Sequence, residues 1–242
     1  MTEKLSIVMP VYNEEAVLGV FIEELSSEIL NRFEDPELVI IDDCSTDDSF
    51  CVATRCAAVD TRVRVERMKQ NSGHGPTLLR AIDSSRADWI FHVDSDRQFM
   101  AEDFWKLWRE RENADLVLGV RAQRHDPFHR LLLTRVVRLF VSILARRKLQ
   151  DANVPFKLFK REAWNLVRTD LDADTLAPSI MLAIGTARLG RIVEVDVRHL
   201  PRVHAPSTLR AWRLLKFSIH GLVELVSFVY RLRRSSSDRF RG

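Results

Sequence analysis

The stretch Trp89-Ile-Phe-His-Val-Asp94-Ser-Asp96-Arg-Gln98 joins an apolar run of strand length to two carboxylates and an amide. In open α/β sheets, ligands bind beyond the carboxyl ends of the strands. Two carboxylates at such a position repel each other unless a proton or a cation lies between them. Oxygen ligands of this kind suit Mg²⁺ or Mn²⁺. Because Asp is also common in turns, the stretch alone fits either a metal site or a surface turn. The other segments of the sequence are needed to distinguish the two.

The composition is that of one large domain. The chain has 242 residues, of which 46% are hydrophobic, which is enough for a substantial core. The formal net charge is only +3, unlike the strongly basic balance of a nucleic-acid binder, so we expect no nucleic-acid partner. The three cysteines, Cys44, Cys51 and Cys56, are odd in number and lack zinc spacing. They indicate reduced thiols in a cytoplasmic protein.

The apolar segments are too short or too interrupted to predict a transmembrane helix. The first residues lack the layout of a signal peptide. The best candidate span, residues 214–230, is interrupted by Lys216, His220 and Glu224, whereas a span needs about 20 mainly apolar residues. We therefore expect a protein that contacts a membrane without crossing it.

The first half of the chain alternates between strand and helix patterns. Apolar runs predict strands at residues 5–11, 37–43, 62–68, 89–93 and 116–120. Helical spacing of apolar residues predicts helices at residues 14–30, 50–59, 77–85 and 104–112. This alternation predicts an α/β fold with a mainly parallel, doubly wound sheet flanked by helices.

From residue 128 onward the pattern changes to two long amphipathic helices, at residues 128–147 and 209–234, with a strand at 192–197. We expect a catalytic domain at 1–210, followed by a C-terminal amphipathic helix and basic tail at 211–242. Apolar helix faces flanked by arginines suit the headgroup region of a membrane, although packing on the domain or on a dimer partner gives the same pattern. We expect residues 231–241 to be disordered and to add attraction to anionic lipid.

Polar residues follow the ends of several predicted strands. The first strand ends in Pro10, Tyr12, Asn13 and Glu14, and the second in Asp42 and Asp43. A loop with Gly73 and Gly75 leads into a helix N-terminus, which favours phosphate. A Tyr ring can stack on a base, and carboxylates can accept hydrogen bonds from ribose hydroxyls. Tyr12 alone would fit a core aromatic and the aspartates would fit turns. Together, these residues predict a pocket for a nucleoside diphosphate and a metal.

Three segments resemble the signature segments of family 2 glycosyltransferases, in the family's order. They are Val8-Met-Pro-Val-Tyr-Asn-Glu14, Ile41-Asp-Asp-Cys-Ser-Thr-Asp47 and Val93-Asp-Ser-Asp-Arg-Gln98. The resemblance covers residues 5–210. It is greatest to the subgroup with dolichol-phosphate mannose synthase and bacterial polyprenyl-phosphate glycosyltransferases, whose D-x-D-x-Q motif is matched by Asp94, Asp96 and Gln98. A later Asp and a Phe-Lys/Arg-Leu-Phe segment are matched by Asp151 and Phe156-Lys-Leu-Phe159.

The resemblance implies a Rossmann-like GT-A fold and an inverting transfer of a sugar from a UDP- or GDP-sugar. It implies that Asp94, Asp96 and Gln98 hold Mn²⁺ or Mg²⁺ and the donor diphosphate, with Asp96 also taking part in catalysis. Arg121 would add a positive contact, unless it is an ordinary exposed arginine. The expected nucleotide contacts are Pro10, Tyr12, Asn13, Glu14, Asp42, Asp43 and Gly75.

The segment Leu200-Pro-Arg202-Val-His204-Ala-Pro-Ser207-Thr resembles the subgroup's R-x-x-G-x-S loop. The resemblance implies that Arg202, His204 and Ser207 bind the donor diphosphate or the acceptor phosphate. Two departures are visible, since Ala205-Pro206 replaces the usual glycine region here and Cys44 stands where glycine is frequent.

The acceptor determines whether a catalytic base is needed. A polyprenyl phosphate is already anionic at neutral pH and needs positive charge to position it, whereas a sugar hydroxyl needs a general base. Residues 121–161 are rich in Arg and Lys, which favours a phosphate acceptor or an anionic membrane surface. Asp174 is the alternative, because it lies where hydroxyl-transferring relatives carry a catalytic acidic pair. It would equally fit the N-cap of a helix near residues 179–184.

We therefore expect a polyprenyl-phosphate glycosyltransferase that is peripheral to the cytoplasmic face of the membrane. The rivals are transfer to a saccharide or lipid hydroxyl with Asp174 as base, and an inactive glycosyltransferase-like subunit that binds lipid or a partner enzyme. The sugar, the acceptor, a homo-oligomer and a small membrane partner subunit all stay open. The remaining histidines are expected to be structural or exposed: His74, His92, His125, His129 and His199.

Overall fold

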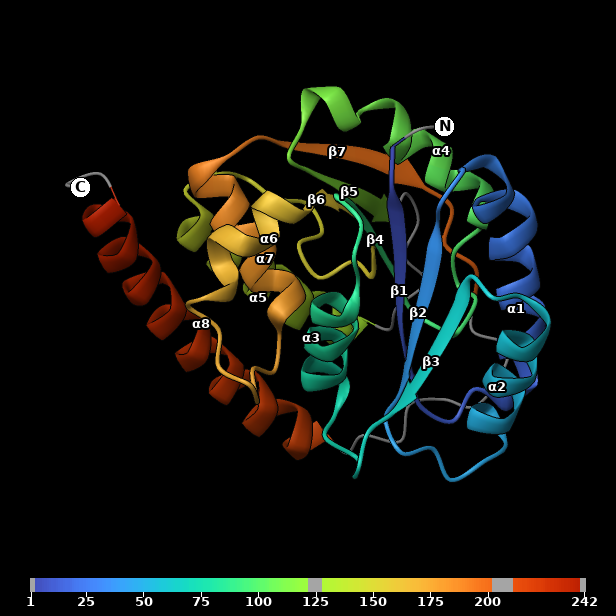
Figure 1. The fold of residues 1–242 in the computed structure, drawn as a ribbon. Helices are drawn as coiled ribbons and strands as arrows, with labels where there is room; N and C mark the ends of the chain where they lie inside the picture. The colour runs from blue at the N-terminus through green and yellow to red at the C-terminus, as the bar shows by residue number, and fades with distance from the viewer. Residues whose placement is uncertain (1–2, 122–127, 202–210, 240–242) are drawn as a thin grey trace.

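The structure is a computed structural model that describes residues 3–121, 128–201 and 211–239 (Figure 1). Within these ranges it describes every side chain except those of residues 128–136, 211–220 and 236–239. The expected loop residues Arg202, His204 and Ser207 therefore lie outside the described residues.

The described residues form one seven-stranded sheet in the order β3-β2-β1-β4-β6-β5-β7. All neighbouring strands are parallel except β6, which is antiparallel to both β4 and β5. This confirms the mainly parallel α/β sheet and adds β6, a strand that the sequence patterns did not predict. The strands are β1 Leu5–Val11, β2 Glu37–Asp42, β3 Val63–Arg67, β4 Trp89–Val93, β5 Leu116–Arg121, β6 Phe156–Lys160 and β7 Ile192–Val197.

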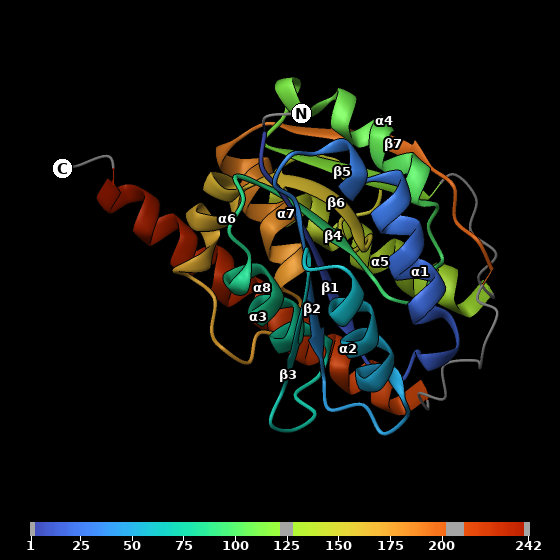
Figure 2. The same cartoon turned by 45° about the vertical axis from the view of Figure 1, so that its right-hand side comes forward.

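Helices cover both faces of the sheet. Figure 1 shows α1 and α2 on one side and α3, α6 and α7 on the other, while α8 runs along the outer side of the α6 and α7 layer. The turned view in Figure 2 agrees with this arrangement. The helices are α1 Glu15–Glu28, α2 Ser49–Val59, α3 His74–Ser84, α4 Phe104–Arg109, α5 Phe128–Ala145, α6 Arg161–Arg168, α7 Pro178–Leu189 and α8 Ala211–Arg239. Short 3-10 turns lie at Leu30–Arg32, Ala101–Asp103 and Arg111–Asn113.

The central strands are apolar on both faces, as parallel strands covered by helices must be. Every residue of β1 and of β4 is buried. Apart from Ser6 on β1 and His92 on β4, these buried residues are apolar, and the polar residues of the sequence motifs gather where the strands end.

The helix α3 begins three residues earlier than the sequence predicted. Gly73 precedes it with a φ of 89°, a left-handed conformation that glycine adopts without steric cost. Pro76 then lies in the first turn, where the missing N–H has no intrahelical partner to lose. The glycine-rich segment is therefore the start of the helix, and not a loop before it.

The prediction that residues 231–241 are disordered is wrong for residues 231–239, which continue α8. The Nε of Arg231 donates to the carbonyl of Asp170 at 3.0 Å, and the Oγ of Ser235 donates to the Asp170 carboxylate at 2.7 Å. Two turns before Arg231, the carboxylate of Glu224 accepts the backbone N–H of Leu176 at 3.1 and 3.2 Å. These contacts, which sequence periodicity does not reveal, fix the helix to the segment before α7.

Among the residues that the structure describes, no helix is both long enough and apolar enough to cross a membrane.

Replacing Gly185 by Ala should lower the free energy of unfolding by about 1–3 kcal/mol, because it overpacks the contact between α7 and α6. A Cβ at this position would collide with Cγ1 of Val167. This cost exceeds the roughly 1 kcal/mol that Ala gains over Gly inside a helix.

Gly221→Ala on α8 is the matched control, since none of the described residues comes within 4 Å of its added Cβ. It should leave stability unchanged or raise it. Urea unfolding followed by circular dichroism measures both variants. Equal effects of the two substitutions would contradict this account of the packing between α6 and α7.

Candidate functional site

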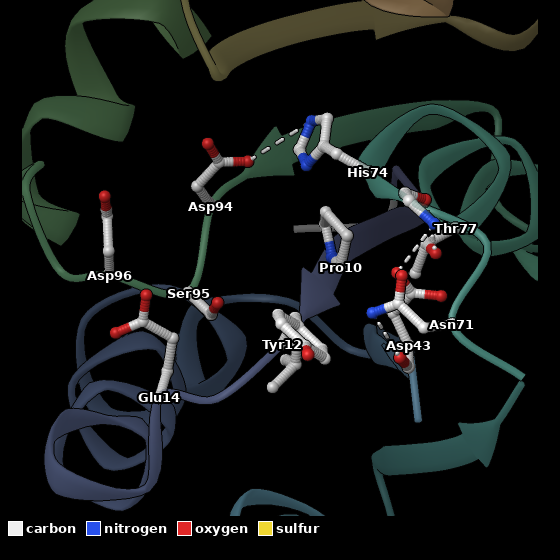
Figure 3. Close-up of a pocket in the computed structure, with 12 residues that line it drawn as sticks. Pro10, Tyr12, Glu14, Asp43, Asn71, His74, Thr77, Asp94, Ser95 and Asp96 are labelled. Carbon is white, nitrogen blue, oxygen red and sulfur yellow. Dashed lines mark hydrogen bonds and ion pairs between the residues drawn. The ribbon is translucent and has the colours of Figure 1, made fainter. Parts of the chain in front are cut away.

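Two adjoining cavities lie at the carboxyl ends of β1 and β4, with volumes of about 520 and about 410 Å³. The first cavity is lined by Pro10, Tyr12, Glu14, Asp43, Asn71 and Gly73, among others (Figure 3). The second is lined by Gln98, Arg121, Asn153 and the start of α7, among others. His74, Asp94 and Asp96 line both cavities. The D-x-D aspartates therefore lie at the junction of two chambers.

Asp43 holds the loop that closes one side of the first cavity. Its two carboxylate oxygens accept the backbone N–H groups of Ser72 and Gly73, each at 2.8 Å. The side-chain amide of Asn71 donates to the Asp43 carbonyl at 3.2 Å. Since a carboxylate has about four acceptor positions, Asp43 can hold this loop and still accept hydrogen bonds from a ligand in the cavity.

Asp42 and Asn13, expected to contact the nucleotide, do not line either cavity. Asp42 is fully buried and accepts the N–H of Ser45 at 3.1 Å, with the Nε of Arg67 at 3.2 Å. Asn13 has a φ of 55° and accepts the N–H of Thr46 at 2.9 Å. Both side chains thus stabilise the loop after β2, and they affect the cavity by positioning that loop.

Gly75, expected to approach a phosphate, instead permits close packing. A Cβ there would collide with the carbonyl oxygen of Thr175. The cavity is lined by the two residues before it, Gly73 and His74. The first turn of α3 still faces the cavity, but through these residues.

The acidic motif is held in place by its own neighbours. The backbone N–H of Gln98 lies 3.3 Å from the Asp96 carboxylate. The Gln98 side-chain amide donates to the carbonyl of Leu200 at 3.0 Å, while the N–H of Leu200 donates back to the Gln98 carbonyl at 2.8 Å. The side-chain oxygen of Gln98 is not used in these bonds, so it is available as a ligand.

Two imidazoles lie beside Asp94, and the amine of Lys157 acts on it electrostatically. The Oδ1 of Asp94 lies 3.4 Å from the Nε2 of His92 and 3.8 Å from the Nε2 of His74. Burial raises the pKa of Asp94, but the charges of His74, His92 and Lys157 outweigh it, and the resulting pKa is below the usual value. Asp94 is therefore ionised at neutral pH. Burial also holds the pKa of His92 below its usual value, although Asp94 opposes this.

Lys157 is fully buried on β6, directly opposite His92 in the antiparallel ladder. Its Nζ donates to the carbonyls of Ala152 at 2.6 Å and Ser179 at 2.8 Å. Burial lowers its pKa to about 7, against the raising effect of Asp151 and Asp94. Lys157 thereby joins two segments that border the second cavity.

Arg121 is partly buried in the wall of the second cavity. Its guanidinium forms a bidentate ion pair with Asp151, with Nε 2.7 Å from Oδ2 and Nη2 3.1 Å from Oδ1. A guanidinium has five N–H donors, so this pair orients Arg121 and leaves donors for an anion. It is not the ordinary exposed arginine that the sequence allowed.

Asp174, the alternative base, is exposed and lines neither cavity. It is not the N-cap of α7 either, because that helix begins at Pro178 and Ala177 is its N-cap.

Sequence reasoning missed His74, His92 and Lys157. His92 was treated as structural because a single histidine in an apolar strand is usually a core residue. One signal was available, since residues two apart in a strand face the same side and His92 precedes Asp94 by two. His74 and Lys157 come close to Asp94 only through tertiary contacts.

A mainly parallel sheet with paired carboxylates at the end of β4, where two cavities adjoin, has the architecture of GT-A glycosyltransferases. Residues 6–192 match the model of glycosyl transferase family 2. The chain belongs to this family.

Relatives and solved structures agree with this assignment. The chain is 30% identical over 213 residues to undecaprenyl-phosphate 4-deoxy-4-formamido-L-arabinose transferase of Pseudomonas aeruginosa (strain LESB58), which covers 87% of this chain and 62% of that protein. It is 24% identical to the transferase of the same description from Photorhabdus laumondii, over 95% of this chain and 70% of that protein. The chain thus spans about 62% of the length of the Pseudomonas protein.

The fold matches that of glucosyl-3-phosphoglycerate synthase from Mycobacterium tuberculosis in a complex with Mn²⁺, UDP and phosphoglyceric acid. The TM-score is 0.69 at 21% sequence identity, covering 94% of this chain and 78% of that chain. This similarity confirms the expected fold class.

Lys157→Met should change how stability depends on pH. The pKa of Lys157 is about 7 in the folded protein and near 10.4 in the unfolded chain, so the unfolded state binds more protons between these values. The destabilisation by the buried amine is therefore complete below pH 7 and is relieved as the pH rises towards 10. Wild type should gain stability relative to Lys157→Met across this range.

Urea unfolding of both proteins at pH 7, 8, 9 and 10 measures this difference. Comparing the two proteins cancels the titration of groups that they share. Parallel curves for wild type and variant would mean that Lys157 keeps an ordinary pKa.

Proposed function

We propose that the protein is a metal-dependent, inverting glycosyltransferase that moves a sugar from a nucleoside diphosphate sugar to a polyprenyl phosphate. The observation that carries this proposal is that two cavities meet at Asp94 and Asp96. One has the groups for a nucleotide and the other has an oriented arginine. Donor and acceptor can thus reach the same pair of carboxylates from opposite sides.

The first cavity suits the donor nucleotide. Tyr12 is 45% exposed and lines this cavity, so its ring is accessible for stacking on a base. Glu14 and Asp43 offer acceptors for ribose and base N–H groups. Pro10 also lines this cavity (Figure 3). Uridine is the better supported base, since the M. tuberculosis synthase was solved with UDP, and GDP is the alternative.

Asp94, Asp96 and Gln98 would hold the divalent cation. The fit is supported by Asp94, which is ionised and whose Oδ1 is buried without a hydrogen bond from any described residue. When bound, Mn²⁺ or Mg²⁺ would supply positive charge for the leaving diphosphate. In this assignment Asp96 takes part in catalysis as a ligand of the cation.

The second cavity suits an anionic acceptor. Arg121 can bind the acceptor phosphate with the N–H donors that Asp151 does not use. One phosphate oxygen attacks the anomeric carbon of the sugar, the bond from that carbon to the diphosphate breaks, and its electron pair leaves with the diphosphate. The configuration at the anomeric carbon inverts because attack and departure occur on opposite faces. A phosphate needs no base, which is consistent with the position of Asp174 outside both cavities.

A polyprenyl phosphate acceptor is supported by the names of the curated relatives, which act on undecaprenyl phosphate. The cytoplasmic membrane face is then the place of reaction. Support within the chain comes from α8, where Val223, Val226 and Tyr230 form an exposed apolar stripe next to Arg233 and Arg234. Such a combination suits the interface of an anionic membrane.

The rival proposals receive less support. Transfer to a hydroxyl would need a base, and Asp174 lies outside both cavities. A binding subunit without activity would not need the ionised carboxylate at the junction of two chambers.

The test of the proposal is nucleoside diphosphate release by the purified protein. UDP- and GDP-sugars are compared with Mn²⁺ or Mg²⁺, with and without a short polyprenyl phosphate. We expect release that needs both metal and lipid phosphate and that falls by at least about 100-fold in Asp96→Asn, since this variant removes a charged ligand of the metal.

The variant Arg121→Met tests whether the second cavity binds the acceptor. It should raise the KM for the lipid phosphate by about 10- to 100-fold, the value of a charge-assisted hydrogen bond, and leave UDP binding unchanged. Because the single variant removes the ion-pair partner of the buried Asp151, Arg121→Met/Asp151→Asn serves as its control. Release that is independent of lipid phosphate would overturn the acceptor assignment.

Membrane contact by α8 predicts that Val223→Asp/Tyr230→Asp weakens binding to vesicles that contain phosphatidylglycerol. The two side chains are 65% and 68% exposed, so the change should not unfold the protein. Val59→Asp on α2, where the side chain is 90% exposed, is the matched control on another face. Vesicle sedimentation measures binding, and equal binding of the two variants would exclude this surface.

A further inference from the structure

Two histidines beside Asp94 form a cluster with the composition of a transition-metal site. His74 is the first residue of α3, His92 lies on β4, and Asp94 follows β4 directly. Their ligand atoms all lie within 4.8 Å of one another. Figure 3 shows His74 directed at Asp94 from the opposite wall of the cavity.

The cluster is not explained by hydrogen bonding within the protein. The Nε2 of His92 and the Oδ1 of Asp94 are both buried, and neither has a hydrogen bond within the described part of the chain. His92 is only 1% exposed, so solvent does not satisfy it. Their separation of 3.4 Å is longer than the usual range of an N–H···O hydrogen bond. A buried polar atom without a partner destabilises the fold, and a shared cation would remove this cost for both atoms.

The spacing suits a metal ion. Bonds of about 2.0–2.2 Å to nitrogen and oxygen place neighbouring ligand atoms about 3.0–3.5 Å apart around one ion. The distances from Asp94 to His92 (3.4 Å) and to His74 (3.8 Å) are near this spacing, and an inward movement of His74 would bring all three ligand atoms, now within 4.8 Å of one another, around one ion. His74 is about half exposed and begins its helix, so its side chain is free to make this movement.

The ligand types distinguish between metals. Carboxylate and water ligands suit Mg²⁺, whereas imidazole favours first-row transition metals such as Co²⁺ and Zn²⁺. Two imidazoles with one carboxylate leave further coordination positions open for substrate or water. Lys157, opposite His92, donates its protons to two backbone carbonyls and is not a ligand.

We propose that His74, His92 and Asp94 together bind a divalent transition-metal ion at the junction of the two cavities, and that the site discriminates against Mg²⁺. This inference rests on the proposed function only for the role of the ion, because Asp94 would place the ion at the donor site. The selectivity for transition metals follows from the two histidines alone. The expected oxygen ligands Asp96 and Gln98 would complete the coordination.

Metal binding to the full chain, without nucleotide, tests the proposal. Isothermal titration with Co²⁺ and with Mg²⁺ gives the affinities, and the visible absorption of bound Co²⁺ reports nitrogen ligands. We expect Co²⁺ to bind at least about tenfold more tightly than Mg²⁺, following the preference of imidazole sites. His74→Gln and His92→Gln should each weaken Co²⁺ binding by about tenfold or more and leave Mg²⁺ binding nearly unchanged.

His199→Gln is the matched control, because His199 also lines the second cavity but does not belong to the cluster. It should keep the Co²⁺ affinity of wild type. His74→Gln changes a half-exposed side chain, so it decides the question even if the buried His92→Gln fails to fold.

The proposal is overturned if Co²⁺ and Mg²⁺ bind equally, or if His74→Gln keeps the Co²⁺ affinity and absorption of wild type. Its failure is distinct from that of the proposed function. Lipid-dependent UDP release that is supported by Mg²⁺ and unaffected in His74→Gln would disprove the histidine site and agree with the proposed transferase activity. Tight Co²⁺ binding without any binding of a nucleotide sugar would agree with the metal site and disprove the proposed transferase activity.

Discussion

The parallel pairing of β2, β1 and β4 is the constraint on which the site depends. These strands are buried on both faces, and their register aligns Pro10 with Ile41 and Val8 with His92. Polar groups in such strands are costly unless paired, so most of them occur where the strands end, with Ser6 in β1 and His92 in β4 as exceptions. The ladder therefore brings segments some 30 and 80 residues apart in sequence to one edge of the sheet. Both cavities are built on that edge.

Much of the fold was predictable because it follows local patterns. Apolar runs located β1, β2, β4 and β5, and alternation with helices predicted that most of them are parallel. The antiparallel β6 was not predicted, since its partners lie far away in sequence and its second residue, Lys157, is a buried lysine. The helical continuation of α8 to Arg239 also depends on distant groups, because Asp170 holds its last turns.

The site was predictable in its outline and less so in its details. The spacing of the motif predicted Asp94 and Asp96 at the end of β4, and the cavity at the end of β1 contains Pro10, Tyr12 and Glu14 as expected. Whether a side chain faces the cavity or supports a loop depends on hydrogen bonds across loops. Asp42 was misassigned for this reason, as it turns towards Ser45 and Arg67. The imidazoles beside Asp94 come from separate elements, and only their assembly makes them neighbours.

The hydrogen bond from Leu176 to Glu224 links the outer helix α8 to the wall of the second cavity. Leu176 and the two residues after it border the second cavity, and Glu224 belongs to the same helix as the exposed stripe of Val223, Val226 and Tyr230. Moving α8 relative to the sheet would either pull this wall along or break the bond, at a cost of about 1–3 kcal/mol. A displacement of α8 would therefore be transmitted through this bond to the wall of the second cavity.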